Sequence, residues 1–458
     1  MNIHFKSLLT LLLLFLFLIA CNVEQNESNV EIDNSSGVVH PEWSYDATIY
    51  EANIRQFSEE GTFNAFSEGL PAIKNMGVDI IWLMPIHPIG EKNRKGSLGS
   101  YYAVKNYLGV NPEFGTEDDL RNLVNKIHEM GMYVIIDWVA NHSSWDNPLT
   151  VTNPEFYTTD ENGNFVPPVE DWADVIDFNY DNPGLRRYMT DALLYWVKEF
   201  NIDGYRCDVA GMVPTDFWEQ SRKELDEIKP VFMLAEAGEP ELQENAFDMT
   251  YNWQLKNLMN EIAAGEKNAL NFNEYLAEEL KTYDENYFRM VFTTNHDENS
   301  WDGTVFERLG EGYKTFAVLT GTVNGMPLIY SGQEAGLDKR LQFFEKDPIE
   351  WKDHPIRELY TKLFNLKKNN QALWNGKKGG SISRINTDND ENVLIFKREK
   401  GENIVVTILN LSDESQKATV LDGTLEGNFK NLFSETEEVN QLSTSHQLKP
   451  WEYQVWFK

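Results

Sequence analysis

Residues 185–208, LRRYMTDALLYWVKEFNIDGYRCD, contain one helix–strand unit, and this pattern decides the fold. The apolar positions of the first part recur at helical spacing, at Leu185, Met189, Ala192, Leu193, Trp196, Val197 and Phe200. Residues 204–208 then form a short strand that ends in a carboxylate. An amphipathic helix followed at once by a buried strand is typical of a parallel α/β sheet.

The same unit recurs along the chain from about residue 43 to 378. The expected strands are residues 48–54, 78–84, 133–137, 204–208, 231–236, 247–251, 289–294 and 327–331. Thr116 and Asp119 form a capping box that opens a helix, and Gly131 stops it. Eight such units over this length predict a TIM (β/α)8 barrel.

Two further segments depart from the helix–strand alternation. About forty residues separate the third strand from the next helix, so we expect residues 143–180 to form a small inserted subdomain. After residue 378 the helical period ends, and residues 393–396, 404–409 and 453–457 have strand patterns. Residues 379–458 are therefore expected to form a C-terminal antiparallel β-sandwich.

The N-terminus has the pattern of an export signal. Lys6 precedes an apolar run at residues 8–20, which is too short to span a bilayer comfortably. The run ends in Leu-Ile-Ala-Cys, which resembles the bacterial lipoprotein processing site and implies acylation of Cys21. Residues 1–20 are then a lipoprotein signal peptide and residues 21–42 a flexible acidic tether. The protein is predicted to be exported and anchored in a membrane, at the outer membrane, the cell surface or the periplasmic face. The alternative is an ordinary signal peptide with a chance cysteine.

The amino-acid composition limits the classes of molecule that the protein can bind. The formal net charge is −33, so the chain should repel nucleic acid, and a neutral substrate fits it better. Only two cysteines are present, and with Cys21 acylated no intramolecular disulfide can form.

Four carboxylates stand at the ends of expected strands. Asp137, Asp208, Glu236 and Asp297 follow the third, fourth, fifth and seventh strands, so the barrel should gather them at one end. Arg206 shares a strand face with Asp208 and should lower its pKa, whereas the apolar approach to Glu236 should raise the pKa of that carboxyl. Two carboxyls with opposed pKa shifts suit glycoside hydrolysis. Each residue alone could instead cap the helix that follows it.

The segments DWVANH (137–142), GYRCD (204–208), LAE (234–236) and NHD (295–297) resemble, in order and spacing, those of the α-amylase family, glycoside hydrolase family 13. The resemblance covers the chain from about Asp46 to its C-terminus. It implies Asp208 as nucleophile, Glu236 as general acid/base and Asp297 as the third carboxylate at the sugar, with retention at the anomeric carbon.

The resemblance also implies residues that bind substrate and metal. The residues implied to bind the sugar are Tyr101, His142, Arg206 and His296, with Tyr102 as the other register for the tyrosine. Arg206 is implied to act by positioning the nucleophile, while Asp137 supports the site. Asn141 and Asp177 are implied as ligands of a structural Ca²⁺, with Asp171 and Asp174 as further candidates. The alternative for Asn141 is that it only ties its loop together. The chain departs from many α-amylases at Gly211 and Met212, where those enzymes have a Lys-His pair.

These observations predict an endo-type hydrolase of α-1,4-glucosidic bonds in starch, glycogen or maltooligosaccharides. A relative that uses the same residues as a cyclomaltodextrinase, an α-1,6-glucosidase or a transglycosylase is the first alternative. A non-catalytic glucan-binding lipoprotein is the remote one, because such a protein should lack some of the three carboxylates.

Overall fold

Eight parallel strands form a closed barrel in the computed structural model, which describes residues 37–421, 427–434 and 439–458. Around the barrel the strands run in the order β1-β10-β9-β8-β7-β6-β3-β2. Their bounds are β1 Ile49–Ala52, β2 Ile80–Leu83, β3 Tyr133–Trp138, β6 Gly204–Cys207, β7 Phe232–Ala235, β8 Met249–Tyr251, β9 Phe288–Val291 and β10 Met326–Tyr330. The predicted TIM barrel is confirmed, with strand ends that differ from the expected ones by a few residues.

The barrel strands separate two apolar cores because successive side chains point to opposite faces. The inner core contains Ile49, Ile80, Ile135, Phe232, Leu234, Met249, Met290 and Leu328. The alternate positions pack outward against the helices in the larger core, among them Tyr50, Ile81, Ile136, Tyr205 and Met233. Polar residues at inner positions near the carboxyl ends of the strands therefore lie inside the barrel mouth.

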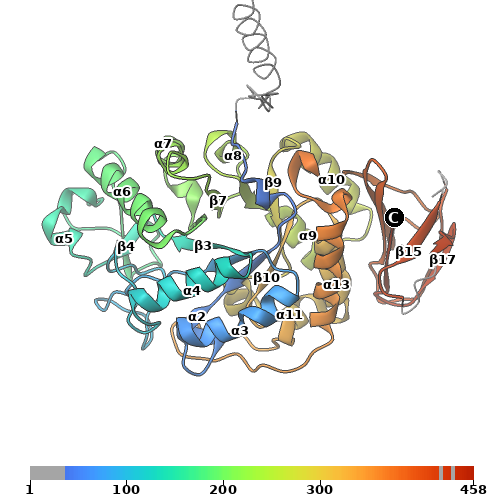
Figure 1. Cartoon of the computed structure of the whole chain (residues 1–458), viewed down its shortest axis with the longest axis horizontal. Coiled ribbons are helices and arrows are strands. Elements are labelled where there is room, and N and C mark those ends of the chain that lie inside the picture. Colours follow the sequence, from blue (N-terminus) through green and yellow to red (C-terminus); the bar gives the residue numbers. More distant parts are fainter. Residues whose placement is uncertain (1–36, 422–426, 435–438) are drawn as a thin grey trace, which may run out of the picture. The chain divides into compact units, whose positions relative to one another are not determined.

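Helices lie around the strands (Figure 1). Their bounds are α2 Ile54–Phe57, α3 Phe63–Asn75, α4 Glu117–Glu129, α6 Pro183–Phe200, α7 Thr215–Asp226, α8 Leu242–Asn245, α9 Trp253–Ala263, α10 Asn271–Thr282, α11 Val305–Leu309, α12 Tyr313–Thr322 and α13 Ile356–Asn369. The predicted capping box is present, since Thr116 and Asp119 bond to each other's backbone N–H at the start of α4. The stripe predicted from Leu185 to Phe200 is buried on α6.

The segment after β3 forms the predicted inserted subdomain. It contains the short strands β4 His142–Ser144 and β5 Val175–Asp177 and the helix α5 Leu149–Thr152. The two strands pair antiparallel, with His142 opposite Asp177. The subdomain thereby holds His142 at its junction with the barrel.

The C-terminal strands are antiparallel, as predicted. One sheet has the order β11-β12-β13-β18-β15-β16, and β14 pairs with β17 in a second sheet. The bounds are β11 Ser381–Arg384, β12 Val393–Lys400, β13 Asn403–Asn410, β14 Gln416–Thr419, β15 Asn428–Asn431, β16 Val439–Gln441, β17 Ser445–Leu448 and β18 Tyr453–Phe457. Residues of both sheets, such as Ile408 and Ala418, share one core. Phe396 of β12 stacks on Phe272 of α10 at 5.9 Å between ring centroids, which joins this domain to the barrel.

The N-terminal end of the described chain is packed, in contrast to the flexible tether predicted up to residue 42. Val38 and His40 are buried, and the His40 ring lies 2.7 Å from Asp248 and stacks on Phe288. The prediction is therefore wrong for the last residues of the tether. The predicted signal peptide and Cys21 lie outside the described residues, so the lipid anchor stays a prediction. Of the helices in the described ranges, none has the length and apolarity needed to cross a bilayer.

Candidate active site

A cleft of about 710 Å³ opens at the carboxyl ends of the barrel strands. The loops that follow the strands supply its floor, and the inserted subdomain supplies part of its wall. The lining residues are Lys95, Ser100, Tyr102, His142, Asp171, Trp172, Asp174, Val175, Asp208, Val209, Glu236, Asp297, Trp301, Phe343 and Phe344. Carboxylates and aromatic rings thus face each other across one space.

The three carboxylates predicted from the sequence all line this cleft. Asp208 follows β6 and Glu236 follows β7, and the N–H groups of both residues still donate to the neighbouring strands, so their backbones are fixed. Asp297 follows β9 on the opposite side. Only about a tenth of each of the Asp208 and Glu236 side chains is exposed, against 40% of that of Asp297. The barrel therefore brings together groups that are up to ninety residues apart in sequence.

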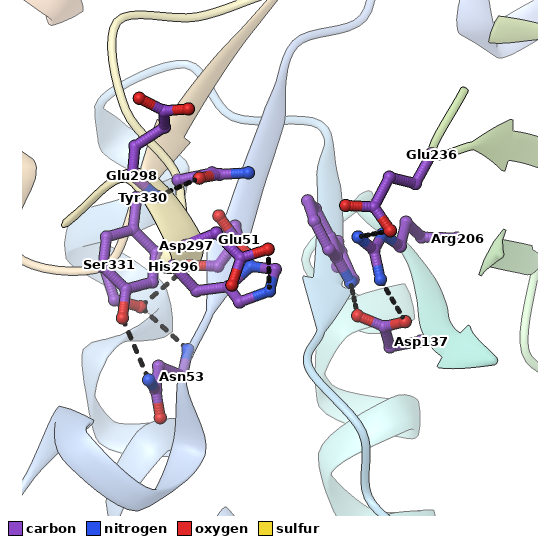
Figure 2. Close-up of polar contacts among 12 residues, drawn as sticks. Glu51, Asn53, Asp137, Arg206, Glu236, His296, Asp297, Glu298, Tyr330 and Ser331 are labelled. Atoms are coloured by element: carbon purple, nitrogen blue, oxygen red, sulfur yellow. Dashed lines mark hydrogen bonds and ion pairs between the residues drawn. The ribbon is translucent and has the colours of Figure 1, made fainter. Parts of the chain in front are cut away.

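Arg206 lies fully buried behind the carboxylates. Its Nη1 lies 2.8 Å from Asp137, and its Nη2 lies 2.8 Å from Glu236 (Figure 2). The same Nη1 lies 3.0 Å from Asp208. One planar guanidinium thus fixes two cleft carboxylates and one supporting carboxylate. Arg206 has no exposed surface in this structure, so it contacts the carboxylates and not the open cleft, in keeping with the positioning role that the resemblance implies.

Burial dominates the protonation of the pair. It raises the pKa of Asp208 well above its ordinary value; nearby Glu236 raises it further, and Arg206 only partly opposes the shift. Burial also raises the pKa of Glu236, as predicted, against the lowering effect of Arg206. The prediction of a low pKa at Asp208 is wrong in direction because it left the burial of this carboxyl out. Two coupled carboxyls with raised pKa values hold one proton between them over an intermediate pH range, which leaves one acid and one anion.

A comparison with known protein families identifies the family to which this chain belongs. Residues 29–166 and 168–381 match the model of the α-amylase catalytic domain. The chain belongs to the α-amylase family. It is therefore a glycoside hydrolase of that family, and its fold is shared with solved α-amylases.

The names of several proteins with similar chains describe enzymes that act on α-glucans. The structure of a maltogenic α-amylase from Thermotoga neapolitana has a TM-score of 0.81 and 31% identity, and covers 90% of this chain and 98% of that one. The maltogenic α-amylase of Bacillus acidopullulyticus is 28% identical over 86% of this chain and 70% of its own length. A cyclomaltodextrinase from Thermoanaerobacter pseudethanolicus is 26% identical over 82% and 72%.

The tyrosine at the cleft of this α-amylase family member is Tyr102, which is the other register that the sequence leaves open beside Tyr101. The Tyr102 hydroxyl donates to Asp137 at 3.1 Å and lies 2.7 Å from His296 Nε2, while its ring lines the cleft. Tyr101 is buried on the other side of the backbone, where Arg55 covers its ring and its hydroxyl donates to Asn53. Adjacent residues point in different directions here, so a shift of one position exchanges a cleft residue for a core residue.

The two predicted histidines occupy different places in the family site. His142 lines the cleft, and burial lowers its pKa to about 3, so its ring is neutral. His296 lies beneath the cleft and is almost fully buried, and its direct contact with the sugar stays a prediction. Burial alone would lower the pKa of His296, but the carboxylates of Asp297 and Glu51 outweigh it and raise this pKa to about 9.

Sequence reasoning missed the aromatic residues of the cleft. Trp301 lies in a turn of π-helix, Glu298–Asp302; it is 52% exposed, and its indole N–H donates to Asp297 at 3.2 Å. The Phe343 ring lies 5.2 Å from that of Trp301, and Trp172 of the subdomain packs on His142. Exposed aromatic faces suit the apolar faces of sugar rings. The one available signal was that Trp301 follows the NHD segment by four residues.

The two predicted calcium ligands lie on neighbouring segments: His142, next to Asn141, pairs with Asp177, and the Phe178 N–H donates to the Asn141 carbonyl at 3.0 Å. The Asn141 side-chain oxygen contacts its neighbour His142, and Lys95 Nζ lies 3.1 Å from Asp174 and donates to the Asp171 carbonyl. The Lys95 ammonium group therefore occupies the position beside Asp171 and Asp174 where a bound cation would have to lie. Burial raises the pKa of the half-buried Asp177, and its ligation of Ca²⁺ together with Asn141 stays a prediction. In the described ranges, groups of three or more His, Cys, Asp or Glu arranged for a metal are absent.

We expect the chelator EDTA to leave the thermal unfolding midpoint unchanged, because Lys95 already neutralises this part of the subdomain. Differential scanning calorimetry with EDTA, and then with excess Ca²⁺, measures this. A midpoint that falls with EDTA and returns with Ca²⁺ would support the calcium site implied by the family resemblance and contradict our interpretation.

Proposed function

We propose that the protein hydrolyses α-1,4-glucosidic bonds in starch, glycogen or maltooligosaccharides, with retention of configuration. The contact of one guanidinium with both Asp208 and Glu236 carries this proposal. Retaining enzymes need two carboxyls close together, whereas inverting enzymes need room for a water molecule between them. The names of the relatives support the substrate class, since they include maltogenic α-amylases and a cyclomaltodextrinase.

In the proposed mechanism the cleft residues act in two steps. Glu236 protonates the glycosidic oxygen while Asp208 attacks the anomeric carbon, and a covalent glycosyl-enzyme forms as the aglycone leaves. Glu236 then takes a proton from water, which cleaves the intermediate and restores both carboxyls. Asp297, on the opposite wall, holds sugar hydroxyls, and Tyr102 supports the ring of the bound sugar from the floor.

A second candidate is a preference for cyclodextrins or short maltooligosaccharides over long chains. The names of the maltogenic and cyclomaltodextrinase relatives favour it. The departure at Gly211 and Met212 supports it as well, because these exposed positions do not offer the Lys-His pair of many starch-type enzymes. We place this activity outside the cytoplasm, on the predicted anchor at Cys21.

The test is product analysis on defined substrates. Purified protein is incubated with starch, maltoheptaose, β-cyclodextrin and pullulan, and products are separated by chromatography and examined by NMR before mutarotation. We expect α-anomers from the α-1,4-linked substrates; early products of many lengths indicate internal attack, and early maltose indicates maltogenic action. The absence of products from all four substrates, or release of β-anomers, would refute the proposal.

A further inference from the structure

Glu51 is a buried carboxylate inside the barrel that the mechanism above does not use. It stands on β1, two residues after the inner-core residue Ile49, so its side chain also points inward. Its exposed fraction is zero. A carboxylate at such depth is costly unless a partner compensates its charge.

The partner is His296. Glu51 Oε1 contacts the Nδ1 atom of that ring, and Figure 2 draws this contact as a dashed line between the two side chains. The Nε2 atom on the far side of the ring lies 2.7 Å from the Tyr102 hydroxyl and 3.4 Å from the Asp297 carboxylate. Glu51 is thus joined through one imidazole to two residues that line the cleft.

The hydrogen-bond partners indicate where the protons lie in the series of side chains from Tyr102 through His296 to Glu51. Tyr102 has a single hydroxyl proton and donates it to Asp137, so His296 must donate to the Tyr102 oxygen through Nε2–H. A second proton lies between Nδ1 and Glu51. The Asp297 carboxylate at 3.4 Å attracts positive charge to the ring, so the second proton belongs to His296, and Glu51 is the anion.

We propose that Glu51 is a positioning residue of the active site, which holds His296 as an imidazolium so that its Nε2–H fixes Tyr102 and its charge orients Asp297. The inference rests on the proposed function, because it assigns to these two residues a role at the bound sugar. Nothing in the family resemblance drew attention to Glu51; its place on the inner face of β1 does.

Electrostatics agree with this geometry. The pKa of His296 is raised to about 9 although burial opposes the charged ring, because Asp297 and Glu51 flank it. Burial raises the pKa of Glu51, and the charge of His296 opposes that shift. The other charged and titratable groups that face this pair from neighbouring elements are Asp137, Arg206, Glu236, Tyr102, Tyr251 and Tyr330. Arg206, the other cation among them, is already shared by three carboxylates.

The first test is the protonation of His296, followed by NMR of protein labelled with ¹³C at histidine Cε1. The signal is assigned by its absence from a His296→Asn variant. We expect His296 in the parent chain to titrate near 9, and His296 in Glu51→Gln to titrate at a clearly lower pH, because it loses one of the two carboxylates that raise its pKa. A His296 that is neutral at pH 7 in the parent chain, or an unchanged midpoint in Glu51→Gln, would overturn the proposal. The parent titration needs no variant to fold.

The second test is kinetic and uses a matched control. Glu51→Gln keeps size and hydrogen bonding, so we expect an unchanged thermal midpoint, a similar KM and a kcat on the order of 10- to 100-fold lower on maltoheptaose. Glu334 is an equally buried glutamate that accepts from Tyr50 and from the Gly332 N–H outside the cleft, and Glu334→Gln should retain the parent kcat. An unchanged kcat in Glu51→Gln would refute the role. If the parent chain itself cleaves no glucan, the proposed function fails, and the titration still decides whether Glu51 holds His296 charged.

Discussion

Replacing Asp208 with asparagine is expected to give a folded protein that cleaves maltooligosaccharides roughly 10⁴-fold or more slowly than the parent chain. An amide of the same shape cannot form the glycosyl-enzyme, so the two-step path is closed. Folding should persist, because Arg206 keeps its ion pairs with Asp137 and Glu236. Release of reducing ends measures the rate, and circular dichroism with a thermal melt measures the fold.

The control for this substitution is Asp203→Asn, just before β6, the strand that Asp208 follows. Asp203 is paired with His128 at 2.7 Å and with Lys229 at 2.9 Å, away from the cleft. Its loss should lower the thermal midpoint and leave kcat near the parent value. An Asp208→Asn protein that retains a tenth or more of the parent kcat would show that another group is the nucleophile.

The barrel could be predicted because each of its units repeats local patterns that depend on neighbouring residues. The stripe of α6 and the capping box of Thr116 are set by spacing within one or two turns. The predicted tether, residues 21–42, extends too far because its true end depends on contacts with residues distant in sequence. His40 is packed through contacts with Asp248 and Phe288, more than two hundred residues away, and no local pattern announces such contacts.

The candidate site could be predicted in part, for the same physical reason. Asp208, Glu236 and Asp297 follow strands, so the barrel topology alone brings them together. Side-chain direction in loops is not set by topology, which explains why the sequence leaves the register between Tyr101 and Tyr102 open. The pKa of Asp208 depends on burial by the whole fold, and the neighbouring Arg206 alone suggested the wrong direction.

The sequence contains a pattern that indicates the importance of Glu51. The two-residue period of β1 places it inward beside Ile49, where an acidic residue among apolar ones calls for a partner. Its partner His296 lies 245 residues away, so the pair becomes visible only in the folded chain.

Replacing Glu236 with glutamine should produce a loss that depends on the leaving group. On maltooligosaccharides, whose departing oxygen needs a proton, we expect kcat to fall on the order of 10²- to 10⁴-fold. On α-maltosyl fluoride, fluoride departs without protonation, so the first step should remain fast. Stopped-flow measurement should then show a burst of fluoride followed by a slow steady rate, because the variant also lacks the base that activates water.

Azide separates the two roles of Glu236 in that variant. As an anion it attacks the glycosyl-enzyme without a general base, so it should restore the steady rate and give α-maltosyl azide, the product of two inversions at the anomeric carbon. Asp208→Asn is the matched contrast: it forms no glycosyl-enzyme, and neither fluoride nor azide should rescue it in this way. A β-maltosyl azide from Glu236→Gln would mean that azide had displaced fluoride directly. An equal loss on both substrates would mean that Glu236 is not the proton donor, and that its contacts with Arg206 and the Val209 N–H only shape the cleft.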